Sequence, residues 1–247
     1  MIVERQKSVG FFYEHSELRE ELFSHLKHVG DLERLISKVA VGRINPREMN
    51  HLKKALNYTL PIKELLKTQQ NGALKKLSDQ LNSCSYLLEK IDKELMEDAP
   101  MLTHQGGIIK NGVDSDLDEY RKLANSGKDY LVQIQQREVQ RTGITSLKVA
   151  FNKVFGYYLE VSNTHKDKVP PEWIRKQTLV NAERYITEEL KEYEEKILHA
   201  EERLIALEQK YFQLLVQDAG DYVEQIQQNA RVLATLDCLL SFAEVAS

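Results

Sequence analysis

Two stretches of the chain repeat their apolar residues every seven positions, and the segment between them repeats every two. The first stretch carries Leu117, Ala124 and Leu131, with Tyr120, Gly127 and Ile134 between them. The second carries Leu190, Ile197, Leu204 and Tyr211, with Tyr193, Ala200, Leu207 and Leu214 between them. Heptads predict long helices that pack along one seam. We expect one helix from Asp114 to about Gln140, weakened slightly by Gly127, and another that starts at Thr187 and ends or kinks near Gly220.

The segment between these helices predicts short strands. Leu147, Val149 and Phe151 alternate with more polar residues, as do Tyr157, Leu159 and Val161, which is typical of a hairpin. Residues 173–179 and 184–186 predict two further strands. The predicted fold class is therefore mainly α with a small antiparallel β insertion. We expect a helical core and outgoing lever in residues 1–142, a β module in 143–187 at the tip of two long antiparallel lever helices, and a returning lever and core in 188–247.

The first hundred residues predict shorter amphipathic helices. Leu22 and Val29 belong to one apolar stripe, and Asp31 is placed to cap the next helix. Pro46 suits the first position of a helix, whereas Pro61 should break or restart that helix. A longer helix is expected to follow Gly72, with apolar residues from Leu74 to Leu95.

Cysteine usage and hydropathy favour a cytoplasmic protein. No apolar run approaches the length of a membrane span, and the first residues are not typical of a signal peptide. Cys84 and Cys238 both fall in helical patterns without metal-ligand spacing, so we expect two reduced thiols in the core. We expect no membrane partner.

Positive charge is concentrated in the predicted β module. Residues 143–187 hold seven basic and four acidic residues, a net charge of +3, whereas the whole chain has a net charge of −4. A basic segment in an acidic chain favours contact with nucleic-acid phosphates. Composition alone leaves an ordinary mixed-charge surface equally open. No predicted helix in this segment suits the major groove, so base-specific recognition is not expected.

The same segment carries a resemblance to a known family. Residues 151–161, Phe-Asn-Lys-Val-Phe-Gly-Tyr-Tyr-Leu-Glu-Val, closely resemble the clamp of bacterial MutS proteins, and so do residues 174–179, 181–186 and 189–191. Residues 29–35 and 107–109 resemble the core domain of that family. The order and spacing match, and the resemblance covers essentially the whole chain.

The resemblance implies a fragment of a DNA mismatch-repair protein whose levers connect a DNA-holding clamp to an ATPase head. It implies double-stranded DNA as partner, with a second subunit and a downstream repair factor for the full-length protein, near the nucleoid. The predicted backbone-contacting residues are Arg175, Lys176, Thr178, Asn181 and Arg184, then Lys148, Lys153, Lys166 and Lys168. Lysine and arginine suit this role because they attract phosphates.

Other parts of the family pattern are missing. ATP and Mg²⁺ belong to the full-length family, but the chain has no G-x-x-x-x-G-K-[ST] loop, and its only Gly-Lys pair, Gly127-Lys128, falls inside a predicted helix. Phe12-Tyr13-Glu14 has the letters of the mismatch wedge, yet it lies in the predicted core. We therefore expect no cofactor, no metal and no catalysis in this chain.

Two alternatives stay open. Glu195, His199 and Glu202 share one helical face and suggest metal ligands, although a solvated face is the simpler interpretation. Tyr157, Tyr158 and Trp173 suit base stacking, or the core of the sheet. For the chain as a whole, the rival function is a coiled-coil structural or dimerisation module whose β tip contacts protein.

Overall fold

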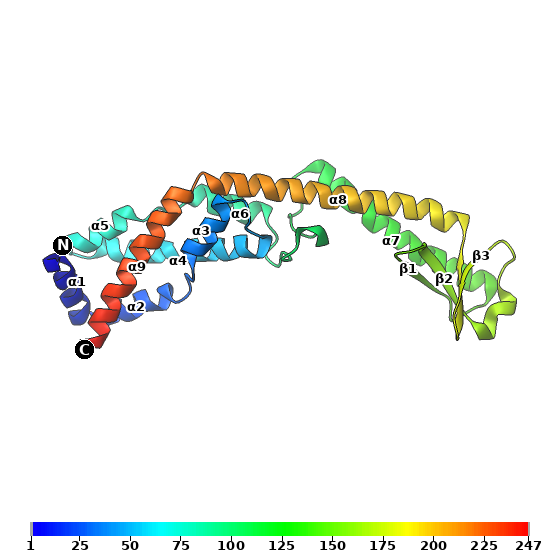
Figure 1. Ribbon diagram of the computed structural model, residues 1–247, viewed down its shortest axis with the longest axis horizontal. Coiled ribbons are helices and arrows are strands. Elements are labelled where there is room, and N and C mark those ends of the chain that lie inside the picture. The colour runs from blue at the N-terminus through cyan, green and yellow to red at the C-terminus, as the bar shows by residue number, and fades with distance from the viewer. Residues whose placement is uncertain (1, 247) are drawn as a thin grey trace. The chain divides into compact units, whose positions relative to one another are not determined.

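The computed structural model describes residues 2–246 and is mainly helical, with one small antiparallel sheet (Figure 1). The predicted fold class is confirmed. The contacts divide the chain into two units. The helical unit comprises the residues up to Val113 and those from Glu208 onward; the lever unit comprises Asp114–Leu207. The expected three-part division into domains stays a prediction.

The helical unit is built from amphipathic helices around a core of leucine and isoleucine. Its helices are α1 (Ile2–Glu14), α2 (Ser16–Leu26), α3 (Leu32–Ala40), α4 (Pro46–Thr68), α5 (Gly72–Gln80), α6 (Ser85–Glu94), the end of α8 (Glu188–Gly220) and α9 (Val223–Val245), with the 3₁₀ turn η1 (Thr103–Gln105). Asp31 accepts a hydrogen bond from the Arg34 N–H at 2.9 Å and caps α3, as predicted. Asn45 and Glu48 form a capping box at the start of α4.

Two predictions about the helices of this unit are wrong. Pro61 does not interrupt α4, which runs through it, because Leu56, Ile62 and Leu66 are fully or almost fully buried and their packing outweighs the local cost of proline. The long helix expected after Gly72 is two helices. The chain leaves α5 at Leu81 and turns through Cys84, whose φ of 48° lies in the left-handed region, before α6 begins.

The second heptad is confirmed only in its first half. Leu190, Ile197 and Ala200 are buried in the lever unit, but Leu214 is exposed. Beyond residue 207, α8 buries Glu208, Phe212, Leu215 and Ala219 instead, a set offset by one residue from the heptad. The buried face of α8 therefore changes where the chain passes from one unit to the other.

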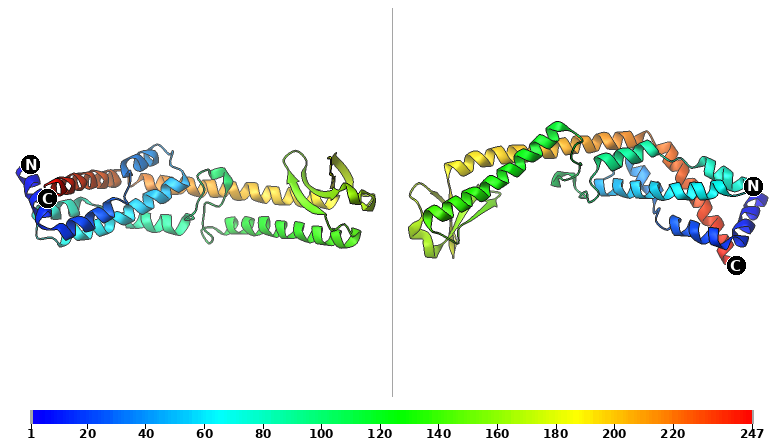
Figure 2. Two further views of the ribbon diagram at one scale, coloured as in Figure 1. Left: turned by 90° about the horizontal axis from the view of Figure 1, so that it is seen from below. Right: turned by 180° about the vertical axis from the view of Figure 1, so that it is seen from behind.

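The lever unit contains α7 (Ser115–Thr142), the first part of α8 and the sheet. The side-chain contacts of Tyr130 with Tyr193, and of Arg137 with Glu189, show that the two helices run antiparallel (Figure 2). The two helices begin where the sequence predicted. Asp114 accepts the Leu117 N–H at the start of α7, and Thr187 accepts the Leu190 N–H at the start of α8. The seam between the helices buries residues of both heptads.

The sheet has four antiparallel strands in the order β1-β2-β4-β3. They are β1 (Lys148–Asn152), β2 (Gly156–Ser162), β3 (Ile174–Thr178) and β4 (Ala182–Ile186), with the 3₁₀ turn η2 (Asn163–Lys168) between β2 and β3. Ser162 pairs with Ala182, so the β3–β4 turn and the β1–β2 turn lie at opposite ends of the sheet. We call residues 143–187 the β-module.

Among the described residues, no helix is both long and apolar enough to cross a membrane. The expectation of two core thiols is half wrong, because Cys84 is buried whereas Cys238 is exposed on α9. The pattern of apolar residues in the sequence did not show whether Cys238 lies on the buried or on the exposed face of α9.

Candidate nucleic-acid interface

One face of the sheet forms the core of the β-module. Leu159, Val161, Trp173 and Tyr185 pack with residues of both helices: Leu131, Ile134, Leu190 and Ile197. Tyr158, on the other face of β2, is also only 5% exposed. The core interpretation is therefore confirmed for Trp173, and Tyr157 packs against the same core while partly buried. Tyr158 is buried on the opposite face of the sheet.

Polar contacts that the sequence did not reveal join the sheet to the helices. Gln135 of α7 accepts the Val149 N–H of edge strand β1 at 3.0 Å. Glu194 of α8 accepts the Tyr157 N–H at 3.2 Å. Gly156 makes this second contact possible: its φ is 80°, and a Cβ there would lie 1.9 Å from a Glu194 carboxylate oxygen. Such long-range contacts leave no local sequence signal.

The outer face carries a polar row across all four strands. Lys148 pairs with Glu160, Glu160 with Arg184, and Arg184 with Gln177 in the strand register. Arg184 donates hydrogen bonds to Glu160 and Gln177, each at 2.9 Å, and its guanidinium lies 4.5 Å from the centre of the Tyr158 ring. Two of the five N–H donors of Arg184 are therefore engaged within the sheet.

A second cluster forms around Glu183. Arg175 donates to this carboxylate at 3.2 Å, and the Tyr185 hydroxyl also donates to it. The hydrogen bond from Tyr185, then the charges of Arg175 and Lys166, hold the pKa of Glu183 below its ordinary value. Burial and Glu183 together raise the pKa of Tyr185 to about 12. Arg175, which is 61% exposed in its side chain, still has donors that face solvent.

Lys176 occupies a β-bulge in edge strand β3. Arg175 pairs with Tyr185 and Gln177 pairs with Arg184, so Lys176 is the extra residue between them. A bulge redirects a side chain away from the regular alternation. Every residue of β3 is exposed. Thr178 and Asn181 follow on this exposed strand and its turn.

Lys166 and Lys168 lie in η2, close to the β3–β4 turn. The Asn163 N–H donates to the Asn181 carbonyl at 3.1 Å, and the Asn163 side-chain amide donates to the Val180 carbonyl at 2.9 Å. The fold therefore brings η2 and the β3–β4 turn together. Lys153 lies at the other end of the sheet, in the β1–β2 turn, and Lys148 lies on the far edge strand.

The lysines of the β-module differ from its arginines in pairing. Five exposed lysines make no ion pair within the described part of the chain: Lys148, Lys153, Lys166, Lys168 and Lys176. Arg175 and Arg184 each pair with a glutamate. Unpaired surface cations are the groups that remain available to an external anion.

The structure also locates the other motifs that the sequence suggested. Gly127-Lys128 lies inside α7, where Lys128 pairs with Glu201 at 2.8 Å, so it does not form a phosphate-binding loop. Phe12 is completely buried in α1 and does not form a wedge. No cluster of potential metal ligands is found among residues 2–246, and Lys196 lies beside Glu195 and His199.

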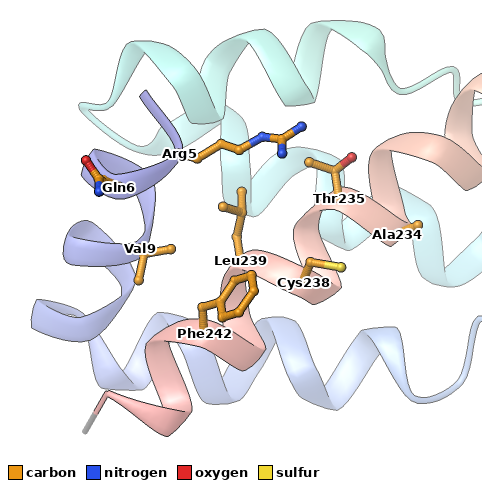
Figure 3. A pocket seen from close by; sticks show the side chains of 8 residues that line it. All are labelled: Arg5, Gln6, Val9, Ala234, Thr235, Cys238, Leu239 and Phe242. Carbon is orange, nitrogen blue, oxygen red and sulfur yellow. The ribbon is translucent and has the colours of Figure 1, made fainter. Parts of the chain in front are cut away.

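A groove in the helical unit has a different character. It has a volume of about 590 Å³ and lies between α1 and α9 (Figure 3). Val9, Leu239 and Phe242 make its surface largely apolar, and Arg5 is the charged residue on its rim. An apolar lining with one cation does not suit the negatively charged sugar–phosphate backbone of a nucleic acid. The candidate nucleic-acid interface is therefore the β-module.

Comparison with known proteins shows the family of this chain. The chain is 56% identical over 245 residues to the DNA mismatch repair protein MutS of Parabacteroides distasonis and 59% identical over 245 residues to that of Cytophaga hutchinsonii. These matches cover 99% of the chain but only 28% and 29% of the relatives. The family model of MutS domain III matches residues 1–243. The chain therefore belongs to the MutS domain III family.

Proposed function

We propose that the β-module holds duplex DNA through its phosphate backbone, as the clamp of a mismatch-repair protein. The observation that carries this proposal is the set of five lysines without an ion pair on a module of net charge +3. The family membership supports it, because the relatives are named DNA mismatch repair proteins. Lysines on strands and turns bind phosphates without recognising bases.

The contact surface proposed first is the end of the sheet formed by η2, β3 and the β3–β4 turn. It holds Lys166, Lys168 and Lys176, with Arg175, Thr178 and Asn181 as further donors. Lys148 and Lys153 extend the basic surface but lie apart from this group. Arg184 is assigned first to the sheet, since it donates hydrogen bonds to Glu160 and Gln177 and lies over the Tyr158 ring.

We further propose that α7 and α8 act as levers that connect the clamp to parts found in the longer relatives. The chain spans less than a third of those relatives. An ATPase head, its ATP and Mg²⁺, a second subunit, a downstream repair factor and a location at the bacterial nucleoid are proposals for that longer protein. The chain itself is proposed to hold DNA without catalysis.

Duplex-DNA affinity across a salt series tests the clamp proposal. Each phosphate contact contributes about −0.9 to the slope of log K against log salt, so removing three contacts should flatten the slope by about 2 to 3. The variant is Lys166→Glu, Lys168→Glu and Lys176→Glu together. The control reverses Lys54, Lys75 and Lys93, which are exposed in the helical unit and give the same change in net charge.

The control separates local contact from general charge. If both triple variants weaken binding equally, the β-module is not the contact surface. If the chain does not bind DNA at low salt but self-associates, and reversal of the β-module lysines abolishes that association, the dimerisation module is the better function.

A further inference from the structure

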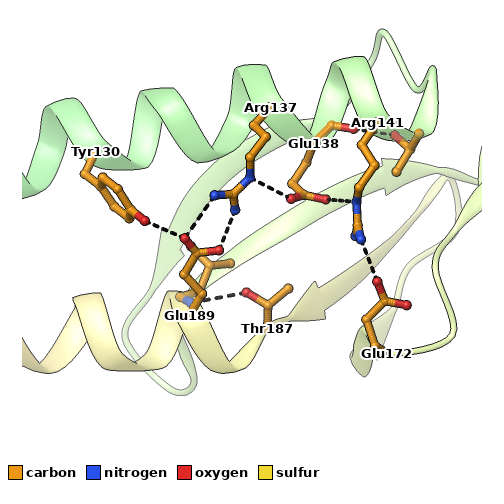
Figure 4. Close-up of polar contacts among 9 residues, drawn as sticks. Tyr130, Arg137, Glu138, Arg141, Glu172, Thr187 and Glu189 are labelled. Atoms are coloured by element: carbon orange, nitrogen blue, oxygen red, sulfur yellow. Dashed lines mark hydrogen bonds and ion pairs between the residues drawn. The ribbon is translucent and has the colours of Figure 1, made fainter.

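A chain of ion pairs joins three elements of the lever unit. It consists of Arg137, Glu138 and Arg141 on α7, Glu189 in the first turn of α8, and Glu172 just before β3 (Figure 4). We call these five residues the Glu138 network. Tyr130 adds a hydrogen bond to Glu189.

Glu138 lies at the centre of this network. Its side chain is only 8% exposed, and its two carboxylate oxygens accept hydrogen bonds from Arg137 Nε at 3.2 Å and Arg141 Nε at 2.8 Å. A buried carboxylate needs such partners to be stable. Both arginines are about half exposed and have long, flexible side chains. Glu138 therefore fixes the direction in which each of them extends.

The two arginines then reach different elements. Arg137 makes a bidentate contact with Glu189, one bond of which is 3.2 Å long. Arg141 Nη1 donates to Glu172 at 2.7 Å. Bidentate arginine–carboxylate contacts have a defined geometry. The network thus fixes the start of α8 and the segment before β3 relative to the end of α7.

The position of Glu172 connects the network to the proposed DNA surface. Glu172 is followed by Trp173, which is 6% exposed in the core of the β-module, and then by Ile174, the first residue of β3. β3 is an edge strand with one hydrogen-bonded neighbour, β4. Anchoring its beginning therefore restricts the direction in which it presents Lys176.

We propose that Glu138 is a positioning residue for DNA binding. By holding Arg137 and Arg141, it fixes the start of β3 on α7 and so sets the orientation of the lysines that contact phosphates. This inference rests on the proposed function of the β-module as a DNA clamp. It extends that function to a residue that does not itself contact DNA.

Glu138→Gln distinguishes positioning from electrostatics. The substitution removes one negative charge beside a DNA-binding module, so electrostatics alone predicts tighter binding. Loss of positioning predicts binding weaker by about three- to tenfold and a salt slope smaller by about one, because fewer phosphates are contacted together. Glu192→Gln is the matched control: Glu192 is exposed on α8 and makes no ion pair in the described part of the chain.

Trp173 gives a readout that does not require DNA. It is the single tryptophan of the chain, and it directly follows Glu172. Loosening of this segment should shift the Trp173 emission to longer wavelength and increase its quenching by acrylamide in Glu138→Gln but not in Glu192→Gln. Glu172→Gln, at an exposed position, should change the DNA affinity and the Trp173 emission in the same direction as Glu138→Gln. It replaces Glu138→Gln if the Glu138→Gln variant does not fold.

The outcomes separate the two proposals. Weaker binding together with a changed Trp173 emission supports positioning. Binding as tight as that of Glu192→Gln, with Trp173 unchanged, overturns it. If the unmodified chain binds no DNA at low salt, the clamp proposal fails for this chain. The Trp173 emission of Glu138→Gln then decides by itself whether Glu138 positions β3. An unchanged emission overturns the positioning role as well.

Discussion

A methyl group at Gly127 of α7 would lie 2.3 Å from Cγ1 of Ile197 in α8. Ile197 is 1% exposed, and its branched side chain has little freedom to move aside. Gly127 is therefore not merely a weak point of the helix, as its propensity suggested, because it allows α7 and α8 to approach each other. We predict that Gly127→Ala destabilises the chain by about 1 to 2 kcal/mol, since overpacking costs more than the helix propensity of about 1 kcal/mol gained. Urea unfolding measures this change.

Gly10 provides the matched control. It is also helical, but a Cβ there meets nothing within 4 Å. Gly10→Ala should stabilise the chain by about 0.5 to 1 kcal/mol. In addition, Ile197→Ala should remove most of the penalty of Gly127→Ala in the double variant. A penalty of equal size with and without Ile197 would show that close packing is not the cause.

The two central strands, β2 and β4, could be predicted from the sequence because each has a buried side, whereas every residue of β3 is exposed. Leu159 and Val161 alternate with half-buried residues, and this alternation survives in the structure. The helix break at Cys84 could not be predicted, because no glycine or proline marks it. There, Asn229 of α9 accepts the Asn82 N–H at 2.7 Å and donates to the Asn82 carbonyl at 2.8 Å, contacts between residues 147 positions apart.

The candidate site also depends on contacts that the sequence does not reveal. Composition identified the basic residues of the β-module but not which of them are engaged. Arg184 and Lys176 look equivalent in sequence, yet the strand register places Arg184 opposite Glu160 and leaves Lys176 in a bulge. Pairing across the strands decides which basic side chains are available to an external anion, and the register of that pairing is set by the whole sheet.

Arg184 and Lys176 should therefore respond differently to truncation. Arg184→Ala removes two hydrogen bonds and the contact with Tyr158, so it should lower the free energy of unfolding by about 1 to 2 kcal/mol. Lys176→Ala should change stability by less than about 0.5 kcal/mol and reduce the salt slope of DNA binding by about one. Chemical unfolding and DNA titration, done on both variants, check the pair. The opposite pattern, with Lys176 stabilising and Arg184 not, would contradict the assignment.

Acid should weaken the contact between α7 and α8. The hydrogen bonds from Arg137 hold the pKa of Glu189 below its ordinary value of 4.5. Between the pKa of Glu189 in the folded chain and its pKa of 4.5 in the unfolded chain, the unfolded chain binds more protons. The stabilisation by the Arg137–Glu189 pair is therefore complete above pH 4.5 and is lost as the pH falls through the folded pKa. Because the pair is partly exposed, it contributes about 1 kcal/mol or less.

Unfolding free energies measured from pH 7 down to pH 3 test this assignment. Glu189→Gln should lower stability at pH 7 and show a smaller loss in acid than the unmodified chain. Glu192→Gln, which removes a carboxylate without an ion pair in the described structure, should follow the unmodified chain. Parallel curves for Glu189→Gln and the unmodified chain would show that the Arg137 contact does not contribute.

The two cysteines should differ in reactivity. Burial raises the pKa of the Cys84 thiol to about 11, whereas Cys238 is exposed. At pH 8 only about a thousandth of Cys84 would be thiolate even if reagent reached it, and the thiolate is the reactive form. We predict that iodoacetamide modifies one cysteine per folded chain, Cys238, and modifies both in urea, as counted by mass spectrometry. Cys238→Ser should leave the folded chain unmodified, and rapid modification of Cys84 in that variant would mean that the turn between α5 and α6 opens in solution.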